Sequence, residues 1–438
     1  MQVRIVFTAV FVVCLAFPSF ADKIRTTKPE RAGMSSERLE RINAMAERYV
    51  DEGRFPGIIT LVARDGKLVH TNVVGQRGVD DPRPLEMDHL FRIYSMTKPV
   101  TAVAAMQLYE QGKFHLSDPV EKFIPEVAGM KVQLEDGSLV EPSSKMTMHQ
   151  LLTHTAGLGY GLFPGHPVEK QYIEAELWRS TDLDHFAEKV GKLPLRYHPG
   201  EQWHYSVAVD LTGLVVQRIS GMPYDEYLDK HLFTPLGMDD TFFEVPADKL
   251  DRLLPNHYID RESRTLKTID IDAGLPIIGG TAGRGVAMMD FEKVTLYSGG
   301  GGLVSTAMDY LKFGEMLRRG GELDGVRILG EKTVNYMRKN HLAANLSAGG
   351  SGEQPTSVFN WQGYGFGLGF GTVESPVKSA VLSSKGEYSW GGAAGTIFWV
   401  DPVEQIVVVG MVQLMGAPWP FRPDLRVGTY QAITDSYE

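Results

Sequence analysis

The sequence predicts a mixed α/β fold, in which one antiparallel β-sheet is flanked by helices and joined to a mainly helical part. Two strand-like runs in 57–75 surround Asp65-Gly66, a pair that tolerates the positive φ angles of a tight hairpin turn. Two further runs in 395–414 are interrupted at Asp401-Pro402, and mostly helical patterns separate the two pairs. Hairpins near both ends of the chain therefore predict a single sheet that joins N- and C-terminal strands.

Helical spacing accounts for most of the remaining chain. Apolar residues recur at helical intervals in 36–53, where Ser35 or Ser36 can cap the helix and Gly53 can end it. The irregular, glycine-rich stretch 258–302 is an exception and is a candidate for a loop over the site. Similar helical patterns cover 101–111, 148–153, 207–220 and 307–319.

The first 21 residues have the features of a secretory signal peptide. Arg4 precedes an apolar stretch from Ile5 to Phe17, and small residues at Ser19 and Ala21 form a cleavage site. The stretch is shorter than the roughly 20 residues that a membrane-spanning helix needs. We expect an exported protein, periplasmic or secreted from a bacterium, without a stable membrane anchor after cleavage. The sole cysteine lies in this segment, so the mature protein would have neither disulfides nor thiol chemistry.

The composition is that of an ordinary globular protein. Apolar residues make up 43% and charged residues 22% of the chain. The net charge of −10 is distributed without a basic run, which argues against a nucleic-acid partner. We expect one domain over 22–438, with sheet-forming parts at about 36–92 and 295–438 and a helical insert at about 93–294.

A serine and a lysine open the apolar run "FRIYSMTKPVTAVAAMQLYEQGK". If Ser95 begins a helix, Lys98 lies one turn away on the same face, where the two side chains can meet. Roughly one or two copies of Ser-x-x-Lys are expected by chance, and a second copy joins Ser375 to Lys378. Because that copy contains a proline and shows no helical pattern after it, the context favours Ser95 as a nucleophile and Lys98 as its base.

Two other segments supply what such a nucleophile needs. A free lysine has a pKa of about 10.4, so a lysine base works better beside a tyrosine that shares the proton. Tyr205 in "HYSVAVDLTGL" precedes a helical pattern. The segment "YSWGGAAGTIFWV" places Gly391, Gly392 and Ala393 where a strand should begin. The missing side chains would let a substrate approach backbone amides, which can stabilise an oxyanion.

Together these segments resemble the serine hydrolases of the class C β-lactamase and penicillin-binding-protein fold, and most closely their family VIII carboxylesterase branch. The resemblance covers nearly the whole mature chain. It rests also on "ERAGMSSERLERI", "LLTHTAGL", "HPGEQWHYS", "GGGGLVSTAMDYLKFGEML" and "GGELDGVRIL". It implies a β-lactamase/transpeptidase-like fold, Ser95 as the acylated nucleophile, and Lys98 and Tyr205 as a coupled pair for the proton transfers. It also implies an oxyanion hole formed by the amides of Ser95 and Ala393.

Two departures from the β-lactamase pattern bear on the substrate. Val207 stands where β-lactamases have an asparagine two residues after the tyrosine, and Trp390 stands where they have a lysine that attracts the carboxylate of the antibiotic. Loss of such a charge-assisted contact costs about 1.5–3 kcal/mol. We therefore predict a pocket for an uncharged acyl ester, lined by Trp390, Gly391, Gly392, Val207 and Tyr160.

Other chemistries fit the sequence less well. It has no Gly-x-Ser-x-Gly nucleophile elbow, and its glycine-rich 298–303 lacks the ending of a phosphate loop and indicates a tight turn. The histidines at 149, 154, 198 and 204 lack metal-binding spacing and are expected on the surface, so no metal or cofactor is predicted. The prediction is a serine esterase for small-molecule esters. A β-lactamase or D-amino-acid peptidase, and a cell-wall sensor that is acylated without turnover, are the alternatives.

Overall fold

The computed structural model of the chain describes residues 24–162, 165–270, 290–346, 348 and 362–438. The predicted signal peptide lies outside these residues. Within the described ranges, no helix is both long enough and apolar enough to cross a membrane.

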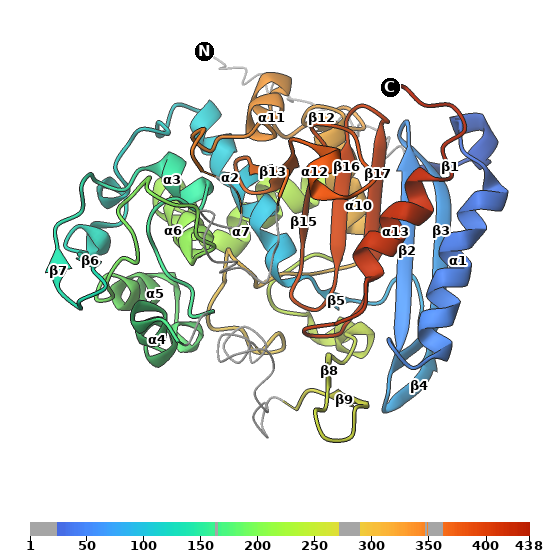
Figure 1. The fold of residues 1–438 in the computed structure, drawn as a ribbon, viewed down its shortest axis with the longest axis horizontal. Coiled ribbons are helices and arrows are strands. Elements are labelled where there is room, and N and C mark those ends of the chain that lie inside the picture. Colours follow the sequence, from blue (N-terminus) through green and yellow to red (C-terminus); the bar gives the residue numbers. More distant parts are fainter. Residues whose placement is uncertain (1–23, 163–164, 271–289, 347, 349–361) are drawn as a thin grey trace, which may run out of the picture.

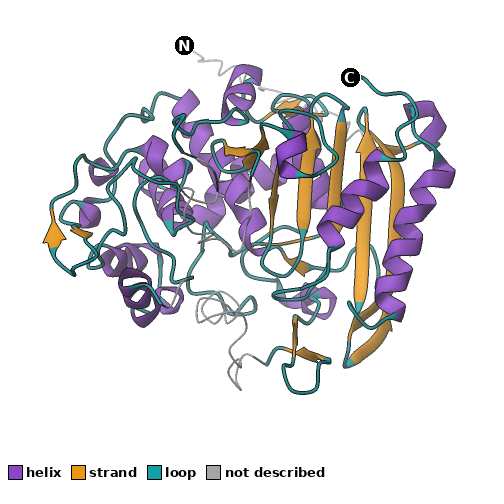
Figure 2. Cartoon of the chain, in the orientation of Figure 1, coloured by secondary structure: helices purple, strands orange, loops and turns teal. Residues whose placement is uncertain are grey.

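A nine-stranded sheet organises one side of the molecule, and the helical part lies on the other (Figures 1 and 2). One short strand, β4 (Asp81–Pro84), pairs with β3 outside the main order. All the pairs are antiparallel except that of β1 with β3, which is parallel and departs from the expected pattern. The main order is β1 (Arg25–Thr26), β3 (Lys67–Gly78), β2 (Gly57–Arg64), β17 (Ile406–Met411), β16 (Ile397–Asp401), β15 (Tyr388–Gly391), β14 (Gly371–Val373) and β13 (Tyr364–Phe366).

Both predicted hairpins are present and lie side by side. Asp65 and Gly66 connect β2 to β3 with φ angles of 53° and 74°, the left-handed conformation that the sequence predicted for this turn. β16 and β17 form the second hairpin. The register of β17 against β2 pairs Ile59 with Met411, so the sheet joins the two ends of the chain as expected.

Helices cover both faces of the sheet. α1 (Ser36–Asp51) and α13 (Phe421–Tyr430) pack on one face against the side chains of Trp399 and Val408. α10 (Ala307–Arg318) packs on the other face against Phe398 and Val409 (Figure 1). Because neighbouring residues of a strand point to opposite faces, the central strands are buried along their whole length.

α2 (Thr97–Glu110) runs between the sheet and the helical part (Figure 1) and is buried along most of its length. The remaining helices are α3 (Met148–Leu152), α4 (Pro167–Glu174), α5 (Leu183–Val190), α6 (Ala208–Ser220), α7 (Tyr224–Leu228), α8 (Thr234–Leu236), α11 (Glu331–Met337) and α12 (Pro376–Ser379). The remaining strands form two-stranded sheets: β5 (Phe91–Arg92) with β10 (Val304–Ser305), β6 (Val132–Gln133) with β7 (Leu139–Val140), β8 (His257–Ile259) with β9 (Leu266–Thr268), and β11 (Glu322–Leu323) with β12 (Val326–Arg327).

One local prediction was wrong. A short helix, α12, does follow Ser375 in the second Ser-x-x-Lys segment, and the side chain of Ser375 accepts a hydrogen bond from the amide of Lys378. Pro376 occupies the first helical position, where its missing N–H has no helical partner to lose. Ser375 therefore caps a surface helix.

Candidate active site

Ser95 lies in a 3-10 helix, η2 (Tyr94–Met96), that leads directly into α2. Every other residue from 91 to 100 is buried, whereas Ser95 is half-buried. The preceding residue, Tyr94, has a φ angle of 44°, and its hydroxyl accepts a hydrogen bond of 2.7 Å from Asn256. A left-handed tyrosine stores on the order of 1–3 kcal/mol of strain, which is typical of backbone held for function. Ser95 is thus the one residue of this segment that is partly accessible, and its buried neighbours hold it in place.

The structure brings Lys98 and Tyr205 to this serine. Lys98 Nζ lies 3.3 Å from Ser95 Oγ, and Tyr205 Oη lies 2.8 Å from the same atom. Lys98 Nζ also lies 4.5 Å from the centre of the Tyr205 ring. Tyr205 comes from the segment before α6, which packs closely against α2. Three residues predicted from two separate segments therefore share one site, in which the lysine and the tyrosine both contact the serine hydroxyl.

A buried carboxylate lies behind the lysine. Lys98 Nζ donates a 2.6 Å hydrogen bond to the carbonyl of Gly300, and the amide of Gly300 donates to Asp210 Oδ1 at 3.0 Å. The hydroxyl of Ser298 donates to the same oxygen. Burial raises the pKa of Asp210, and the charge of Lys98 opposes that rise. Asp210 thus holds the 298–302 turn, whose backbone holds Lys98.

Sequence reasoning missed this support. An aspartate inside the apolar run "AVDLTGLVV", five residues after Tyr205, was the available signal. A tight turn was predicted for 298–303, and the amides of Gly301 and Gly302 close one on the carbonyl of Ser298. Position 300 also requires glycine because the turn lies so close to Asp210: a Cβ there would lie 2.4 Å from Asp210 Oδ2.

Aromatic side chains pack around the ring of Tyr205. The ring of Tyr160 stacks on it at 5.2 Å between centroids, and the ring of Trp390 lies at 5.7 Å. Phe366 contacts Trp390 edge-on at 5.3 Å. Val207 is fully buried at the start of α6, where its amide donates to the carbonyl of Gly159 and so ties the loop before Tyr160 to the helix. Two of the predicted pocket residues, Tyr160 and Trp390, thus lie beside Tyr205, and Val207 holds the loop that precedes Tyr160.

The segment predicted to begin a strand ends one instead. β15 ends at Gly391, and the chain turns through Gly392 and Ala393 before β16 begins at Ile397. The turn closes because the amide of Gly392 donates to the carbonyl of Thr396 at 2.9 Å. β15 packs beside η2, so this turn lies next to the nucleophile segment, and Ala393 is exposed there.

The histidine prediction was also wrong for two of the four residues. His154 and His204 are buried, and the ring of His154 lies 4.8 Å from that of Tyr205. Burial lowers the pKa of both residues, so both are neutral at neutral pH. The spacing signal could not reveal this, because each ring contacts residues distant in sequence: His154 contacts Ser206, and His204 contacts Glu169.

Glu169 organises the loop that carries Tyr160. Its Oε2 accepts hydrogen bonds from the amides of residues 160, 161 and 162, and its Oε1 contacts His204 Nε2 at 2.8 Å and an Arg196 nitrogen at 3.1 Å. Burial alone would raise the pKa of Glu169, but these donors and charges lower it to about 2. Because His204 is neutral, Arg196 supplies the positive charge at neutral pH.

We expect Glu169→Gln to lower the free energy of unfolding at pH 7 by about 3 kcal/mol, because it leaves Arg196 buried without its carboxylate. The ordinary pKa of Glu169 is 4.5, against about 2 in the fold. Its ionisation therefore stabilises the fold fully above pH 4.5, and this contribution is lost as the pH falls toward 2. Urea unfolding at pH 7 and pH 3 measures this, and the variant should lose less stability on acidification. Equal losses in both proteins would contradict the assignment.

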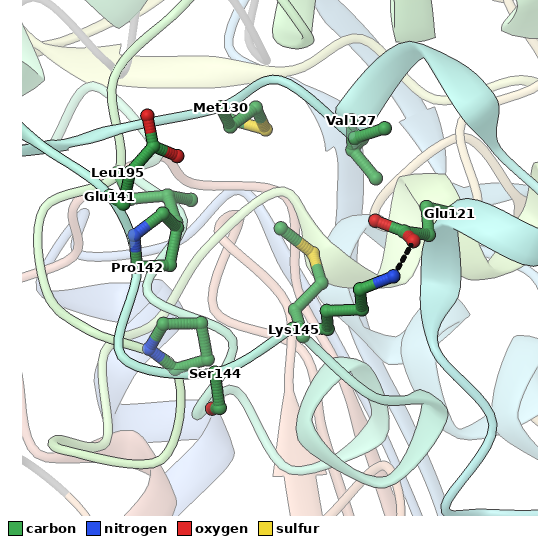
Figure 3. Close-up of a pocket in the computed structure, with 11 residues that line it drawn as sticks. Glu121, Val127, Met130, Glu141, Pro142, Ser144, Lys145 and Leu195 are labelled. Atoms are coloured by element: carbon green, nitrogen blue, oxygen red, sulfur yellow. Dashed lines mark hydrogen bonds and ion pairs between the residues drawn. The ribbon is translucent and has the colours of Figure 1, made fainter.

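A separate pocket of about 300 Å³ lies in the helical part, and none of the predicted catalytic residues lines it. Its wall includes Met130, Leu195 and an ion pair between Lys145 and Glu121 (Figure 3). Among the described residues, no group of three or more His, Cys, Asp or Glu side chains is arranged to hold a metal ion.

Comparisons with known proteins identify the family of the chain. The β-lactamase family matches residues 42–431. Protein Rv1367c of Mycobacterium tuberculosis is 33% identical over 407 residues, which cover 90% of this chain and 93% of that protein. Esterase EstB of Burkholderia gladioli is 31% identical over 365 residues, which cover 82% of this chain and 86% of EstB.

A solved structure extends the match to three dimensions. EstCE1, described as a hydrolase with promiscuous acyltransferase activity, superposes with a TM-score of 0.75 at 27% identity. The superposition covers 91% of this chain and 99% of that protein. The predicted resemblance and the predicted fold class are both confirmed. From the family match, the shared fold and the serine at its centre, we conclude that this chain belongs to the β-lactamase family of serine hydrolases.

Proposed function

We propose that the protein is a carboxylesterase that hydrolyses short-chain acyl esters through an acyl-enzyme on Ser95. One observation carries the proposal: Ser95 Oγ lies 3.3 Å from Lys98 Nζ and 2.8 Å from Tyr205 Oη, beside a wall of aromatic rings. The similarity to EstB and EstCE1, whose names describe an esterase and a hydrolase, supports the same reaction class.

In the acylation step, Ser95 Oγ attacks the ester carbonyl carbon. The hydroxyl proton passes to the pair formed by Tyr205 and Lys98, and the carbonyl oxygen becomes an oxyanion that accepts hydrogen bonds from the amides of Ser95 and Ala393. The tetrahedral intermediate collapses, the bond to the alkoxy oxygen breaks, and the leaving alcohol takes the proton. The acyl group is then bonded to Ser95.

Deacylation repeats these steps with water. The Tyr205–Lys98 pair accepts a proton from the attacking water, the oxyanion forms again in the same hole, and the proton returns to Ser95 Oγ as the acid leaves. Because the second step depends only on which hydroxyl reaches the acyl group, an alcohol in place of water gives an ester by acyl transfer.

The pocket wall supports an uncharged substrate. Trp390 places an indole beside Tyr205 where β-lactamases carry a lysine, and Phe366 packs against that indole. Apolar rings stabilise an acyl chain by burial, at about 25 cal/mol per Å² of apolar surface. A carboxylate-bearing antibiotic would instead lose solvation without gaining a charged partner at this position.

The test is an assay of the purified mature protein on p-nitrophenyl acetate and butyrate, with a chromogenic cephalosporin in parallel. We expect rapid turnover of both esters and a kcat/KM for the cephalosporin at least 100-fold lower. Fast cephalosporin cleavage would mean a β-lactamase. A stable acyl adduct in the intact mass, with no turnover, would mean a cell-wall sensor. No ester turnover and no adduct would overturn the catalytic proposal.

A further inference from the structure

The turn after β15 is held from outside by one arginine of α13. Arg422 Nη2 donates to the carbonyl of Gly392 at 2.6 Å and to that of Thr396 at 2.9 Å, and Arg422 Nε donates to the carbonyl of Gly395 at 3.4 Å. Three carbonyls of a five-residue turn therefore converge on one guanidinium group. The resemblance that identified the turn assigned no role to this residue.

The two glycines at the start of the turn fit between this arginine and the nucleophile segment. A Cβ on Gly391 would lie 2.7 Å from Arg422 Cζ, and a Cβ on Gly392 would lie 2.4 Å from the carbonyl oxygen of Ile93. Ile93 is two residues before Ser95. The missing side chains thus allow the guanidinium group on one side and the backbone of Ser95 on the other to approach the same turn.

The charge of Arg422 has an unusual environment. Within the described part of the chain, no carboxylate lies within ion-pair distance of it, whereas Arg426, one turn further along α13, is paired with Glu387. Burial, together with the neighbouring charge of Arg426, lowers the pKa of Arg422 to about 10, so it remains a cation at neutral pH. Arg422 is half-buried, and its printed hydrogen bonds all go to carbonyls. A cation in such a place without a carboxylate partner departs from ordinary design, and such departures are typical of functional sites.

The geometry of a peptide group connects this cation to the reaction. The carbonyl of Gly392 and the amide of Ala393 belong to one planar trans peptide, so they point in opposite directions. Arg422 binds the carbonyl and thereby fixes the direction of the amide. It also polarises the peptide, because a charge-assisted bond to C=O makes the N–H on the other side a stronger donor.

From this arrangement we propose that Arg422 is a positioning residue of the oxyanion hole, which aims and strengthens the Ala393 amide through the 392–393 peptide. This inference rests on the proposed function, since it takes the Ala393 amide as an oxyanion donor. Through the Ala393 amide, Arg422 would stabilise the substrate oxygen more strongly as negative charge develops on it. The residue then affects the transition state more than the bound ester.

The test compares Arg422→Met and Arg422→Lys with the matched variant Arg426→Lys on the same helix. Complete loss of one oxyanion donor lowers kcat by about 10²–10³-fold, so a misaligned donor in Arg422→Met should lower kcat/KM by about 10–100-fold. KM should change less than about threefold. Arg422→Lys keeps the charge with fewer bonds and should fall between Met and wild type, whereas Arg426→Lys should keep kcat/KM within about threefold.

Binding of phenylboronic acid, followed by tryptophan fluorescence, gives a readout other than turnover. Ser95 Oγ adds to the trigonal boron as its proton passes to the Tyr205–Lys98 pair, and the product is a tetrahedral boronate anion with an oxygen in the oxyanion hole. We expect the Kd of this adduct to rise in Arg422→Met by the same factor as kcat/KM falls.

The melting temperature of each variant is measured first, and kinetics and boronate binding are then compared at a temperature where all variants are folded. If Arg422→Met does not fold, Arg422→Lys and Gly391→Ala, which displaces the guanidinium group, carry the same test. A loss of kcat/KM with unchanged boronate affinity, or no loss at all, would overturn the proposal. If the wild-type protein hydrolyses no ester, the proposed function fails, while boronate binding still reports on Arg422.

Discussion

Replacing Ser95 with alanine should abolish ester hydrolysis, lowering kcat by roughly 10⁵-fold or more. Removal of a nucleophile in other serine hydrolases costs about 10⁶-fold, because the remaining groups act only through it. Here both Lys98 Nζ and Tyr205 Oη are directed at the lost hydroxyl, so neither has another group to activate. The rate of p-nitrophenyl butyrate hydrolysis by the two proteins measures this loss.

The second Ser-x-x-Lys segment supplies the matched control. Ser375 caps a surface helix, and Ser375→Ala should leave kcat and KM within about twofold of wild type. Labelling with a fluorophosphonate and peptide mapping should place the adduct on the peptide containing Ser95 alone. Activity that survives in Ser95→Ala, or an adduct on Ser375, would refute the assignment of the nucleophile.

Lys98→Met should lower kcat/KM by about 10³-fold while leaving the protein folded. Positioned general bases contribute typically 10²–10⁴-fold, and methionine fills the space of the lysine stem without a proton acceptor. The side chain of Lys98 is fully buried, so its replacement removes the unfavourable burial of an amine as well as its bond to Gly300. We therefore expect the free energy of unfolding to stay within about 1 kcal/mol of wild type.

Kinetics and urea unfolding on the same preparation separate these two effects. Lys378→Met, in the second segment, serves as the control and should change neither quantity. If Lys98→Met lost activity only in proportion to a loss of folded protein, Lys98 would have a structural role and no part in the proton transfers. The free energy of unfolding decides between the two.

The features that the sequence predicted depend on interactions between residues that are close together along the chain. The hairpin at Asp65-Gly66 and a helix within 36–53, observed as Ser36–Asp51, were predicted because turn residues, caps and periodicity are local signals. Ser95 and Lys98 share one turn of chain, and motif context was enough to favour them. Tyr205 was less certain alone and gained support from the family resemblance.

What the sequence did not reveal depends on contacts between distant segments. Asp210 supports Lys98 only through Gly300, and Glu169 supports Tyr160 only through three amides of a loop. β15 ends at Gly391, before a turn whose carbonyls accept hydrogen bonds from Arg422 of the distant helix α13. Periodicity and propensity do not identify such pairs. Even the unusual position of Asp210 within an apolar run does not reveal which distant residue it contacts.

The pairing of Ile59 with Met411 has a consequence for how the chain folds. During synthesis β2 has no second neighbour until nearly the whole chain has been made, since β17 inserts between β2 and β16. Contacts this far apart in sequence slow folding, because a large loop must close before they form. We expect the nascent chain to stay largely unfolded until its last strands have been made. We therefore expect β2 and β3 to take their places in the complete sheet only after β16 and β17 have been made.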